Sequence, residues 1–380
     1  MHQKIKYIGY YDTDENNIEK RGYALAATNK MDYICSALNK AGYEVLIVSP
    51  SKTKSNKYYK GKKTAINENV NLKLFPTFPW GNYLQKAISI IMGDIMLILY
   101  LITQTKKNEP ILVYHSLGLK NIVRFAKKIK GFKVILEVEE VYQDVMLYSK
   151  RTRKSEYKNF NIADKYIFPT VLLNQKLNIN NVPYSIISGT YQVEEDRKCK
   201  FDDGKIHVVY AGTFDPRKGG ALAAAAAAAY LPKNYHIHII GFGSKDDTSM
   251  LISSIEDVSK KTEATLTYDG LLSGEEYIRF LQKCDIGLST QIPGATYNET
   301  SFPSKILSYM ANGLRVVSVR IKAIEISDVG QAVYYYDEPS PEVIANVIKS
   351  IDILEPYDSR ELIRDLDKDF VREIKELIEK

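Results

Sequence analysis

The feature of this sequence that most constrains its fold is a regular alternation of short apolar runs with longer amphipathic stretches. The runs have the length and composition of strands, and the stretches have the spacing of helices. The expected strands are residues 4–10, 44–49, 71–75, 111–115, 133–138, 165–168 and 184–188, and then 206–210, 236–240, 264–268, 286–289, 316–319 and 332–336. The expected helices include residues 23–40, 117–130, 221–230, 273–283 and 303–312. Because such alternation builds right-handed βαβ units, it predicts an α/β protein with parallel sheets.

The expected strands form two series, which predicts two domains. A length of 380 residues is too great for one ordinary hydrophobic core and fits two domains of this class. Residues 189–204 are polar, charged and flanked by glycines, as a linker is. We therefore predict an N-terminal domain at residues 1–188, a C-terminal domain at residues 205–355 and a charged amphipathic helix at residues 356–380.

Charge is distributed unevenly between the two halves of the chain. Residues 1–190 contain 29 Lys and Arg and 15 Asp and Glu, a net charge of +14, whereas the rest of the chain has a net charge of −8. This asymmetry indicates an N-terminal half that faces an anionic partner. Nucleic acid and an anionic membrane with lipid-phosphate acceptors both fit, and lysine-rich faces that meet only solvent fit equally well.

Two segments of the basic half bear on a membrane partner. Residues 52–63 place six lysines around Tyr58 and Tyr59, and with so few apolar residues we expect an exposed, mobile loop. Residues 84–103 are apolar over nearly the length of a membrane span, but Asp94 lies at their centre. A central aspartate costs about 2.5–3.5 kcal/mol in membrane insertion, so we expect a buried or interfacial helix there.

Cysteine usage and the first residues indicate a cytoplasmic protein. Cys35, Cys199 and Cys284 are far apart and form no CxxC pair, which argues against a disulfide framework and a zinc site. Residues 1–11 lack the apolar stretch of a signal peptide. No GxGxxG follows the first strand and no Walker A motif is present, which argues against a dehydrogenase and an NTPase.

The first segment with chemical content is residues 208–220, VVYAGTFDPRKGG. Its strand ends at Gly212, and glycine lets the backbone approach a ligand at the carboxyl end of a strand. Arg217 and Lys218 precede a helix that begins near Gly220, where free N–H groups and the helix dipole favour an anion. An anionic ligand would relieve the conflict between these cations and the dipole, and a basic surface turn is the alternative interpretation.

The second segment is residues 298–313, NETSFPSKILSYMANG. Pro303 suits the first turn of a helix, and Gly313 suits the position after its end. This helix start presents the backbone of Ser304 and Lys305 to a ligand. Two anion-binding helix starts in one domain predict a diphosphate.

These two segments, in this order, carry a resemblance to a known family. YAGTFDPRKGG followed by SFPSKILSYMANG resembles glycosyltransferase family 4, over most of residues 205–340. Over residues 1–185 the resemblance is weaker, and there VYHS and ILEVEEVYQDV are similar to the bacterial polysaccharide-biosynthesis branch. The resemblance implies the GT-B fold: two facing Rossmann-like domains with parallel sheets, a final helix that packs back on the first domain, and a donor site in the second.

The resemblance also implies roles for single residues. The family's PRKG lysine contacts the donor diphosphate, which implies a catalytic role for Lys218. The family has a Glu-x7-Glu pair whose first glutamate contacts the donor sugar and whose second contacts the ribose. Counted from Phe302, these positions fall on Thr300 and Ser308. We therefore expect Glu299, one residue away, to contact the sugar and Ser308 to bind the ribose more weakly than a carboxylate would.

The remaining donor contacts are expected in loops at strand ends. Thr213 stands where the family often has an arginine. Residues 267–271, TYDGL, end a strand where the family reads the base mostly through backbone groups. The predicted donor-binding residues are Gly212, Thr213, Arg217, Gly270, Ser304, Lys305 and Ser308.

The acceptor candidates lie in the N-terminal half. His115 ends a strand, where a neutral imidazole suits a sugar hydroxyl, although a hydrogen-bonded structural histidine is an equal alternative. Glu137 and Glu139 can share one face, and Glu139 falls where many family members carry a histidine near the reacting sugar. A solvated acidic edge is the alternative for both. His236 and His238 share a strand face, but no third ligand is apparent, so the sequence predicts no metal site.

The sequence therefore predicts a glycosyltransferase of the hexosyltransferase type in surface polysaccharide biosynthesis. It would transfer a sugar, with retention, from a nucleotide-diphosphate sugar to a saccharide or polyprenyl-diphosphate-linked acceptor, without a metal, a cofactor or a nucleic acid. We expect Lys218, Glu299 and Glu139 to act in catalysis, in the cytoplasm and peripherally on the inner face of the membrane. Two alternatives share the fold: a nucleotide-sugar epimerase, and a non-enzymatic nucleotide-sugar-binding relative, with which Ser308 is consistent.

Overall fold

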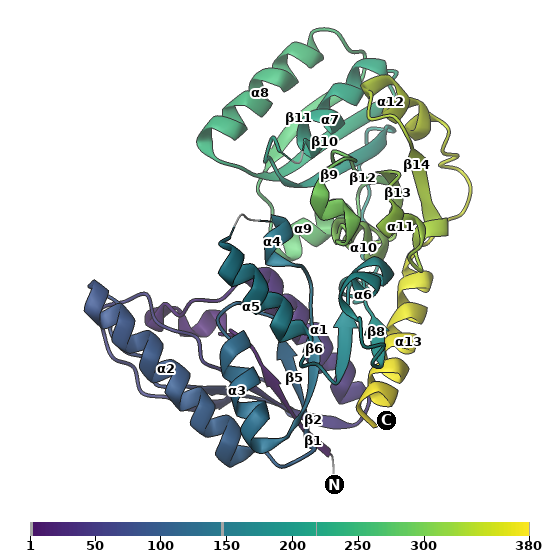
Figure 1. The fold of residues 1–380 in the computed structure, drawn as a ribbon. Helices are drawn as coiled ribbons and strands as arrows, with labels where there is room; N and C mark the ends of the chain where they lie inside the picture. Colours follow the sequence, from purple (N-terminus) through teal and green to yellow (C-terminus); the bar gives the residue numbers. More distant parts are fainter. Residues whose placement is uncertain (1–2, 146–147, 218, 380) are drawn as a thin grey trace. The chain divides into compact units, whose positions relative to one another are not determined.

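The computed structural model describes residues 3–145, 148–217 and 219–379. The chain divides into two compact units. Unit 1 comprises Met1–Ile187 with Lys368–Lys380, and unit 2 comprises Ser188–Asp367 (Figure 1). Both units are α/β, and the predicted parallel sheets are confirmed in both.

Within the described residues, unit 1 has one sheet, in the order β3-β4-β2-β1-β5-β6-β7-β8. Its strands are β1 (Gln3–Ile8), β2 (Tyr43–Ser49), β3 (Lys62–Ala65), β4 (Val70–Leu74), β5 (Pro110–Tyr114), β6 (Lys133–Glu137), β7 (Lys165–Phe168) and β8 (Tyr184–Ile186). Neighbouring strands are parallel except for β3, which pairs antiparallel with β4. The sequence analysis missed β3 because its four residues, KKTA, are exposed at the sheet edge and lack an apolar pattern.

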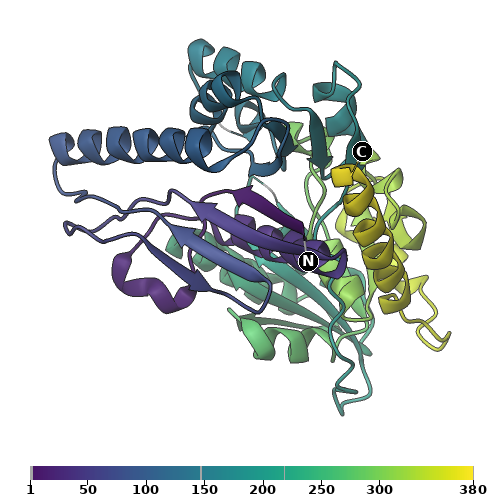
Figure 2. The ribbon, with the colours of Figure 1, turned by 90° about the horizontal axis from the view of Figure 1, so that it is seen from below.

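Helices cover both faces of the unit 1 sheet. They are η1 (Asp14–Glu19), α1 (Leu25–Lys40), α2 (Tyr83–Gln104), α3 (Lys120–Lys130), α4 (Tyr142–Val145), α5 (Lys150–Phe160) and α6 (Val171–Leu177). Side chains of α2, α3, α5 and α6 share one core with alternate residues of the strands, and α3 lies between α2 and α5 (Figures 1 and 2). The opposite face packs on α1, whose Met31, Ile34 and Leu38 are buried.

The last helix, α13 (Arg360–Glu379), contributes its residues from Lys368 onward to unit 1. Phe370 stacks on Tyr33 of α1 with ring centroids 5.8 Å apart. Glu373 accepts a hydrogen bond of 2.7 Å from the hydroxyl of Ser185. The C-terminal end of the helix is therefore part of the core of the unit formed by the first residues of the chain.

Unit 2 contains, among its described residues, a parallel sheet in the order β11-β10-β9-β12-β13-β14. Its strands are β9 (Ile206–Thr213), β10 (Tyr235–Phe242), β11 (Thr265–Gly270), β12 (Ile286–Ser289), β13 (Arg315–Val319) and β14 (Val333–Tyr336). On one face α8 (Lys245–Ser259), α7 (Gly220–Ala227) with η2 (Ala228–Tyr230), and α12 (Pro341–Lys349) form a layer. The other face carries α9 (Gly274–Leu281), α10 (Lys305–Ala311) and α11 (Lys322–Glu325), and short turns complete the unit at η3 (Thr296–Glu299) and η4 (Gly330–Ala332) (Figure 1). Residues 223–229 are seven consecutive alanines within α7 and η2, and their small side chains let the helix pack closely against the sheet.

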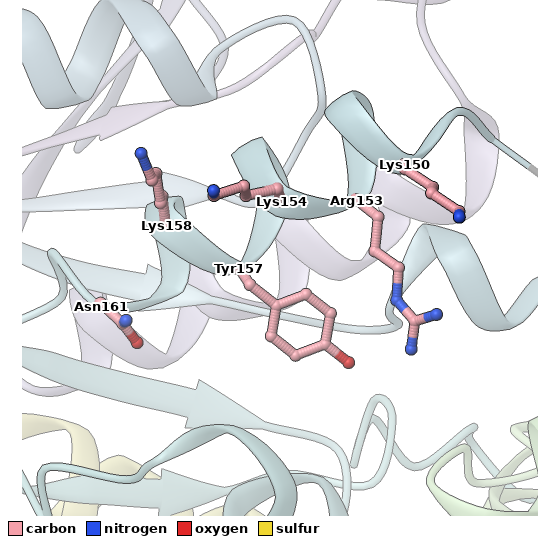
Figure 3. Close-up of a pocket in the computed structure, with 6 residues that line it drawn as sticks. All are labelled: Lys150, Arg153, Lys154, Tyr157, Lys158 and Asn161. Carbon is pink, nitrogen blue, oxygen red and sulfur yellow. The ribbon is translucent and has the colours of Figure 1, made fainter.

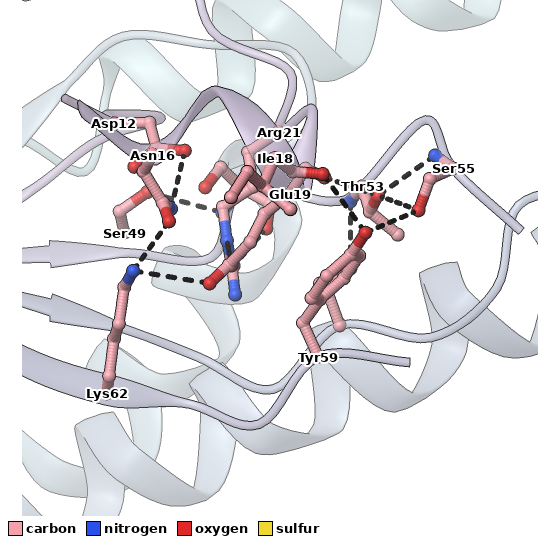
Figure 4. A network of polar contacts seen from close by, with 12 residues as sticks. Asp12, Asn16, Ile18, Glu19, Arg21, Ser49, Thr53, Ser55, Tyr59 and Lys62 are labelled. Carbon is pink, nitrogen blue, oxygen red and sulfur yellow. Dashed lines mark hydrogen bonds and ion pairs between the residues drawn. The ribbon is translucent and has the colours of Figure 1, made fainter. Parts of the chain in front are cut away.

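The lysine-rich residues 52–63 are not the free loop that the sequence predicted. The hydroxyl of Thr53 donates 2.6 Å to the carbonyl of Glu19, and Tyr59 donates 3.0 Å to Ile18. The ammonium of Lys62 contacts both Asn16, at 2.5 Å, and Glu19, at 3.2 Å (Figure 4). The backbone of this segment is therefore held against residues 12–21, because polar side chains supply contacts that the apolar pattern could not reveal.

Helix α2 is long and apolar, yet most of its surface is open. It is the one helix among the described residues long and apolar enough to cross a membrane, with a mean hydropathy of 1.9 and 22% of that window buried. Its inner face buries Ser89, Gly93, Leu97, Tyr100 and Leu101. The sequence predicted either a buried or an interfacial helix here, and the prediction of a buried helix is wrong for most of the α2 surface.

The carboxyl ends of β9 and β10 meet at a pair of glycines. Gly241 has φ = +136°, a conformation that side chains rarely adopt. A Cβ atom built on Gly241 would lie 1.8 Å from the carbonyl oxygen of Gly212, its partner in the neighbouring strand. Only glycine at position 241 therefore allows the two strands to end side by side.

We predict that Gly241→Ala lowers the free energy of unfolding by about 2–5 kcal/mol, because it combines a positive φ with a backbone clash. Urea denaturation followed by circular dichroism measures the change. The matched control is Gly294→Ala, at a position where a Cβ has open space, and it should change stability by less than about 1 kcal/mol. Equal stability of the two variants would contradict the strain at Gly241.

Candidate functional site

The order of strands in unit 2 creates a switch point between β9 and β12. The chain proceeds from β9 to β10 and β11 on one side, and then to β12, β13 and β14 on the other. Strand β12 pairs with β9 only at Ile286 with Val208 and at Gly287 with Val209. Open parallel sheets bind ligands at the carboxyl ends of their strands, where the order reverses in this way.

Tyr309 of α10 fills the gap where β9 and β12 separate. Its hydroxyl accepts a 2.8 Å hydrogen bond from the backbone N–H of Ala211 and donates at 3.2 Å to the carbonyl of Leu288. Burial raises the pKa of this hydroxyl, which keeps its proton available for the donation. A Cβ on Gly287 would lie 2.3 Å from the Tyr309 ring, so the glycine makes room for it. The Tyr309 side chain thus bridges β9 and β12 beyond the point where their backbone pairing ends.

Lys305 lies one helical turn before Tyr309, on the same side of α10. Its ammonium lies 4.1 Å from the centroid of the Tyr210 ring, a cation–π contact. A Cβ on Gly212 would lie 3.1 Å from the same ammonium. The structure therefore brings two of the predicted donor-binding residues, Gly212 and Lys305, together at the carboxyl end of β9.

The other predicted donor residues lie on the loops around this point. Thr213 is exposed at the end of β9, and Gly270 ends β11 with φ = +83°. Arg217 is exposed and pairs with Asp215, with 2.7 Å between Nη2 and Oδ2. Ser304 caps the start of α10 through its backbone position and makes no side-chain capping bond. Lys218 lies outside the described residues.

Glu299 and Ser308 occupy different elements. Glu299 ends η3 and its side chain is exposed. The hydroxyl of Ser308 lies 3.2 Å from that of Tyr277 of α9. A ribose that bound Ser308 would therefore also meet the phenol of Tyr277, which the sequence analysis did not include.

In unit 1 the predicted acceptor residue His115 is enclosed. Its side chain is 2% exposed, and Nε2 lies 3.0 Å from Oε1 of Glu156, a fully buried carboxylate on α5. The backbone N–H of Tyr142 donates 3.0 Å to the same oxygen. Burial lowers the pKa of His115, and Glu156 opposes this effect. His115 is thus hydrogen-bonded inside the unit, which agrees with the alternative interpretation of a structural histidine.

Glu137 and Glu139 interact, as their spacing predicted. Glu137 is fully buried and accepts a hydrogen bond from Tyr7, and burial followed by the charge of Glu139 raises its pKa well above the usual range. A protonated Glu137 supplies the donor that two facing carboxyl groups need. Glu139 is the more open of the two and lies 3.4 Å from the ammonium of Lys30, which also donates at 2.9 Å to the carbonyl of Ile187.

The sequence analysis missed the polar partners of these residues. Tyr309, Tyr277 and Glu156 lie on helices within apolar stripes or charged runs, where nothing in the linear pattern distinguishes them. Each becomes a site candidate only through a contact with a residue far away in the chain. The signal for Tyr309 was a tyrosine among the apolar residues of the segment 298–313, because a buried phenol needs a hydrogen-bond partner.

Comparisons with known proteins agree with this architecture. Residues 205–351 match the family model of glycosyl transferases group 1. A comparison with curated proteins gives no significant match. A trehalose-6-phosphate protein of E. coli, solved with UDP-2-fluoro glucose, has a TM-score of 0.65 at 10% identity, covering 98% of this chain and 99% of that one. An α,α-trehalose-phosphate synthase (UDP-forming) of Burkholderia xenovorans, in complex with glucose-6-phosphate, has a TM-score of 0.63 at 10% identity, covering 99% and 96%.

A third similar structure is HepE of Anabaena in complex with UDP, with a TM-score of 0.63 at 11% identity, covering 99% of this chain and 98% of that one. At such identities the likeness shows the fold alone, and this fold is GT-B. The fold predicted from the sequence is therefore confirmed. Its assignment to family 4 and to the polysaccharide branch stays a prediction.

We predict that Lys305→Gln weakens binding of a nucleoside diphosphate by about 10-fold to 100-fold, because it removes a cation from the carboxyl end of β9. Isothermal titration calorimetry with UDP, and with other nucleoside diphosphates in turn, measures the affinity. The matched control is Lys322→Gln, which removes an exposed lysine paired at 3.0 Å with Glu325. Similar affinities of the two variants would exclude Lys305 from the site.

We predict that, because of Glu137, the free energy of unfolding of unit 1 falls as the pH rises. Since its folded pKa is raised, the folded state holds one more proton than the unfolded state between the usual glutamate pKa and the raised value. In that window the free energy of unfolding should fall by up to about 1.4 kcal/mol per pH unit. Denaturation at a series of pH values should show that Glu137→Gln removes this slope, and that Glu68→Gln, at an exposed position, leaves it. An unchanged slope in Glu137→Gln would contradict a protonated Glu137.

Proposed function

We propose a substrate pair and a mechanism for this chain, whose fold and C-terminal family match make it a glycosyltransferase. The donor is a nucleoside-diphosphate sugar. It binds at the carboxyl ends of β9 and β12, beside the first turn of α10. The acceptor is a saccharide or a lipid-linked saccharide. The observation that carries the donor proposal is the ammonium of Lys305 beside Gly212 at the switch point of the sheet.

The proposed reaction depends on stabilising the leaving diphosphate. As the bond from the anomeric carbon to the leaving oxygen breaks, negative charge grows on the diphosphate. Lys305 and Lys218 supply positive charge to it, and the N–H groups at the start of α7 supply hydrogen bonds. Arg217 can join them by exchanging its partner Asp215 for a phosphate.

We propose that the anomeric configuration is retained and that the leaving phosphate accepts the proton of the attacking hydroxyl. In that mechanism the protein needs no separate general base at the anomeric carbon. Glu299 is proposed to bind the donor sugar, Ser308 to bind the ribose, and Glu139, with Glu137 and His115 behind it, to act on the acceptor side. No metal ion is required by this scheme, because the lysines perform the charge stabilisation that a divalent ion would give.

A basic pocket in unit 1 supports an anionic acceptor. It has a volume of about 580 Å³ and lies on α5 (Figure 3). Its lining residues are Lys150, Arg153, Lys154, Tyr157, Lys158 and Asn161. Four cations around one hollow suit a phosphate, and similar folds have been solved with UDP-sugar and sugar-phosphate ligands. A polyprenyl-diphosphate-linked saccharide, as used in surface polysaccharide synthesis, has the required charge.

Helix α2 and the neighbouring lysines support a peripheral location on the inner face of the membrane. The exposed apolar residues of α2 are Tyr83, Leu84, Ile88, Ile90, Ile91, Met92, Ile95 and Leu99. Residues 52–63 contact this helix and the segment before it: Lys52 is 3.2 Å from Asp94 of α2, and the backbone N–H of Trp80, three residues before α2, donates at 2.9 Å to the carbonyl of Ser55. An apolar row beside exposed lysines fits the headgroup region of an anionic bilayer.

The donor proposal is tested by assaying the purified chain with a set of labelled nucleotide sugars, with and without a lipid extract. Transfer to an extractable product supports a glycosyltransferase with a lipid-linked acceptor. Interconversion of the sugar without an acceptor would indicate an epimerase, and binding without turnover would indicate a non-enzymatic relative.

We predict that Lys218→Ala lowers kcat in this assay, by about 2–4 kcal/mol of transition-state stabilisation, with a smaller change in KM. The expectation follows because charge on the leaving group develops mainly in the transition state. Circular dichroism checks that the variant is folded. A normal kcat in the folded variant would remove Lys218 from the mechanism.

We predict that the chain sediments with anionic liposomes and that salt weakens this binding steeply. Changing Lys54, Lys57, Lys60 and Lys63 to Gln removes four exposed charges and should lower the bound fraction, since each adds about 1 kcal/mol near an anionic surface. Lys62 is kept, because it holds Asn16 and Glu19.

The control for this experiment changes Lys245, Lys260 and Lys261, three exposed lysines of unit 2, to Gln. This variant should bind anionic liposomes as the unchanged chain does. Equal binding to neutral and anionic vesicles, or binding to neither, would contradict electrostatic docking.

A further inference from the structure

Three histidines gather on the sheet of unit 2, away from the proposed donor site. They are His207 on β9 and His236 and His238 on β10. Each offers a ring nitrogen within 4.8 Å of those of the other two. The sequence indicated His236 and His238 as a pair without a third ligand, and the sheet supplies that ligand from a strand nearly thirty residues earlier.

The register of the sheet explains why the three side chains meet. His207 and His236 are direct partners in the parallel pairing of β9 with β10. His238 follows two residues later, and side chains two residues apart lie on the same face of a sheet. The rings of His236 and His238 stack with centroids 3.8 Å apart, so the three imidazoles form one group.

Two aspartates hold the outer nitrogens of this group. Nε2 of His207 lies 2.8 Å from Oδ1 of Asp203, and Nδ1 of His238 lies 3.0 Å from Oδ2 of Asp269. An ionised carboxylate only accepts hydrogen bonds, so both outer nitrogens carry hydrogens. A neutral imidazole has one N–H, and its other nitrogen then carries a lone pair.

When both imidazoles are neutral, the inner nitrogens face each other with lone pairs. Nδ1 of His207 and Nε2 of His238 are 2.9 Å apart. Two neutral imidazoles oriented in this way repel each other unless a cation lies between them. Carboxylates that fix the outer nitrogen of a histidine and direct its inner nitrogen inward are the usual second layer of a metal site.

We propose that His207, His236 and His238 bind a divalent transition metal ion of the zinc class, with Asp203 and Asp269 as the groups that orient the ligands. Imidazole nitrogens suit zinc, at about 2.0–2.1 Å from the ion, and three of them leave a fourth position for water. Two ligands of a tetrahedral ion at that distance are about 3.4 Å apart, so binding requires the inner nitrogens to separate only slightly.

An aromatic ring covers this group of histidines. Phe201 stacks on His207, with centroids 4.0 Å apart, and on His238, with centroids 5.1 Å apart, and so covers the group. His207 is six residues before Thr213, the last residue of β9, and so lies about 20 Å from that end of the strand, whereas His238 is four residues before Phe242 and lies about 13 Å from the end of β10. A bound ion would connect β9 and β10 and, through Asp269, would also reach β11, where the next residue is the predicted donor residue Gly270.

The test is zinc binding to the tag-free, full-length chain after treatment with a chelator. Isothermal titration calorimetry with Zn²⁺ should give one ion per chain, and Co²⁺ should give the visible absorption of a tetrahedral site. We expect Zn²⁺ to raise the melting temperature, because the ion binds the folded chain.

Matched variants separate this site from adventitious zinc binding. His236→Gln should remove one ligand and weaken Zn²⁺ binding by at least about 100-fold, and Asp203→Asn should weaken it by about 10-fold to 100-fold through loss of orientation. His115→Gln, which changes a buried histidine in unit 1, should leave the affinity unchanged. His236 is the most accessible of the three ligands, and circular dichroism verifies that its variant is folded.

Failure to bind Zn²⁺ and Co²⁺ stoichiometrically would overturn the proposal and leave a proton between His207 and His238. Binding that persists equally in His236→Gln and Asp203→Asn would overturn it as well.

Discussion

The hydroxyl of Tyr309 is the contact on which the candidate site of unit 2 depends. Where β9 and β12 diverge, it pairs with the N–H of Ala211 and the carbonyl of Leu288, two backbone groups that the sheet would otherwise leave without partners. The same helix turn carries Lys305 to Gly212. One buried phenol therefore bridges the two strands at their opening, and the helix that carries it also places the cation there.

In unit 1, most of the predicted acceptor residues are enclosed. Glu137 and His115 are bonded inside the unit, to Tyr7 and to Glu156, and Glu139 is the member of this set that remains more open. A buried carboxyl beside another carboxyl keeps its proton, which lowers the electrostatic cost of the pair. Glu139 is therefore the carboxylate of this set that remains open to the acceptor that we propose.

The basic surface of unit 1 is ordered by polar contacts. Residues 52–63 have the composition of a free loop, but Thr53, Tyr59 and Lys62 fix their backbone to residues 12–21. The lysines between these anchors stay exposed beside the open face of α2. Positive charge and apolar surface are thus held next to each other within one unit, and α5 carries a separate basic pocket.

The sequence by itself determined the two sheets, nearly all of their strands, the helix starts near Gly220 and Pro303, the position of Gly212 at a strand end and that of Lys305 at a helix start. Such features follow from hydrophobic period and turn chemistry, which are local along the chain. It missed β3, the tethering of residues 52–63 and the pairing of Ser308 with Tyr277, because each depends on polar groups brought together from distant segments. Only the tertiary structure placed His207 beside His236, since strand register and burial are properties of the assembled sheet.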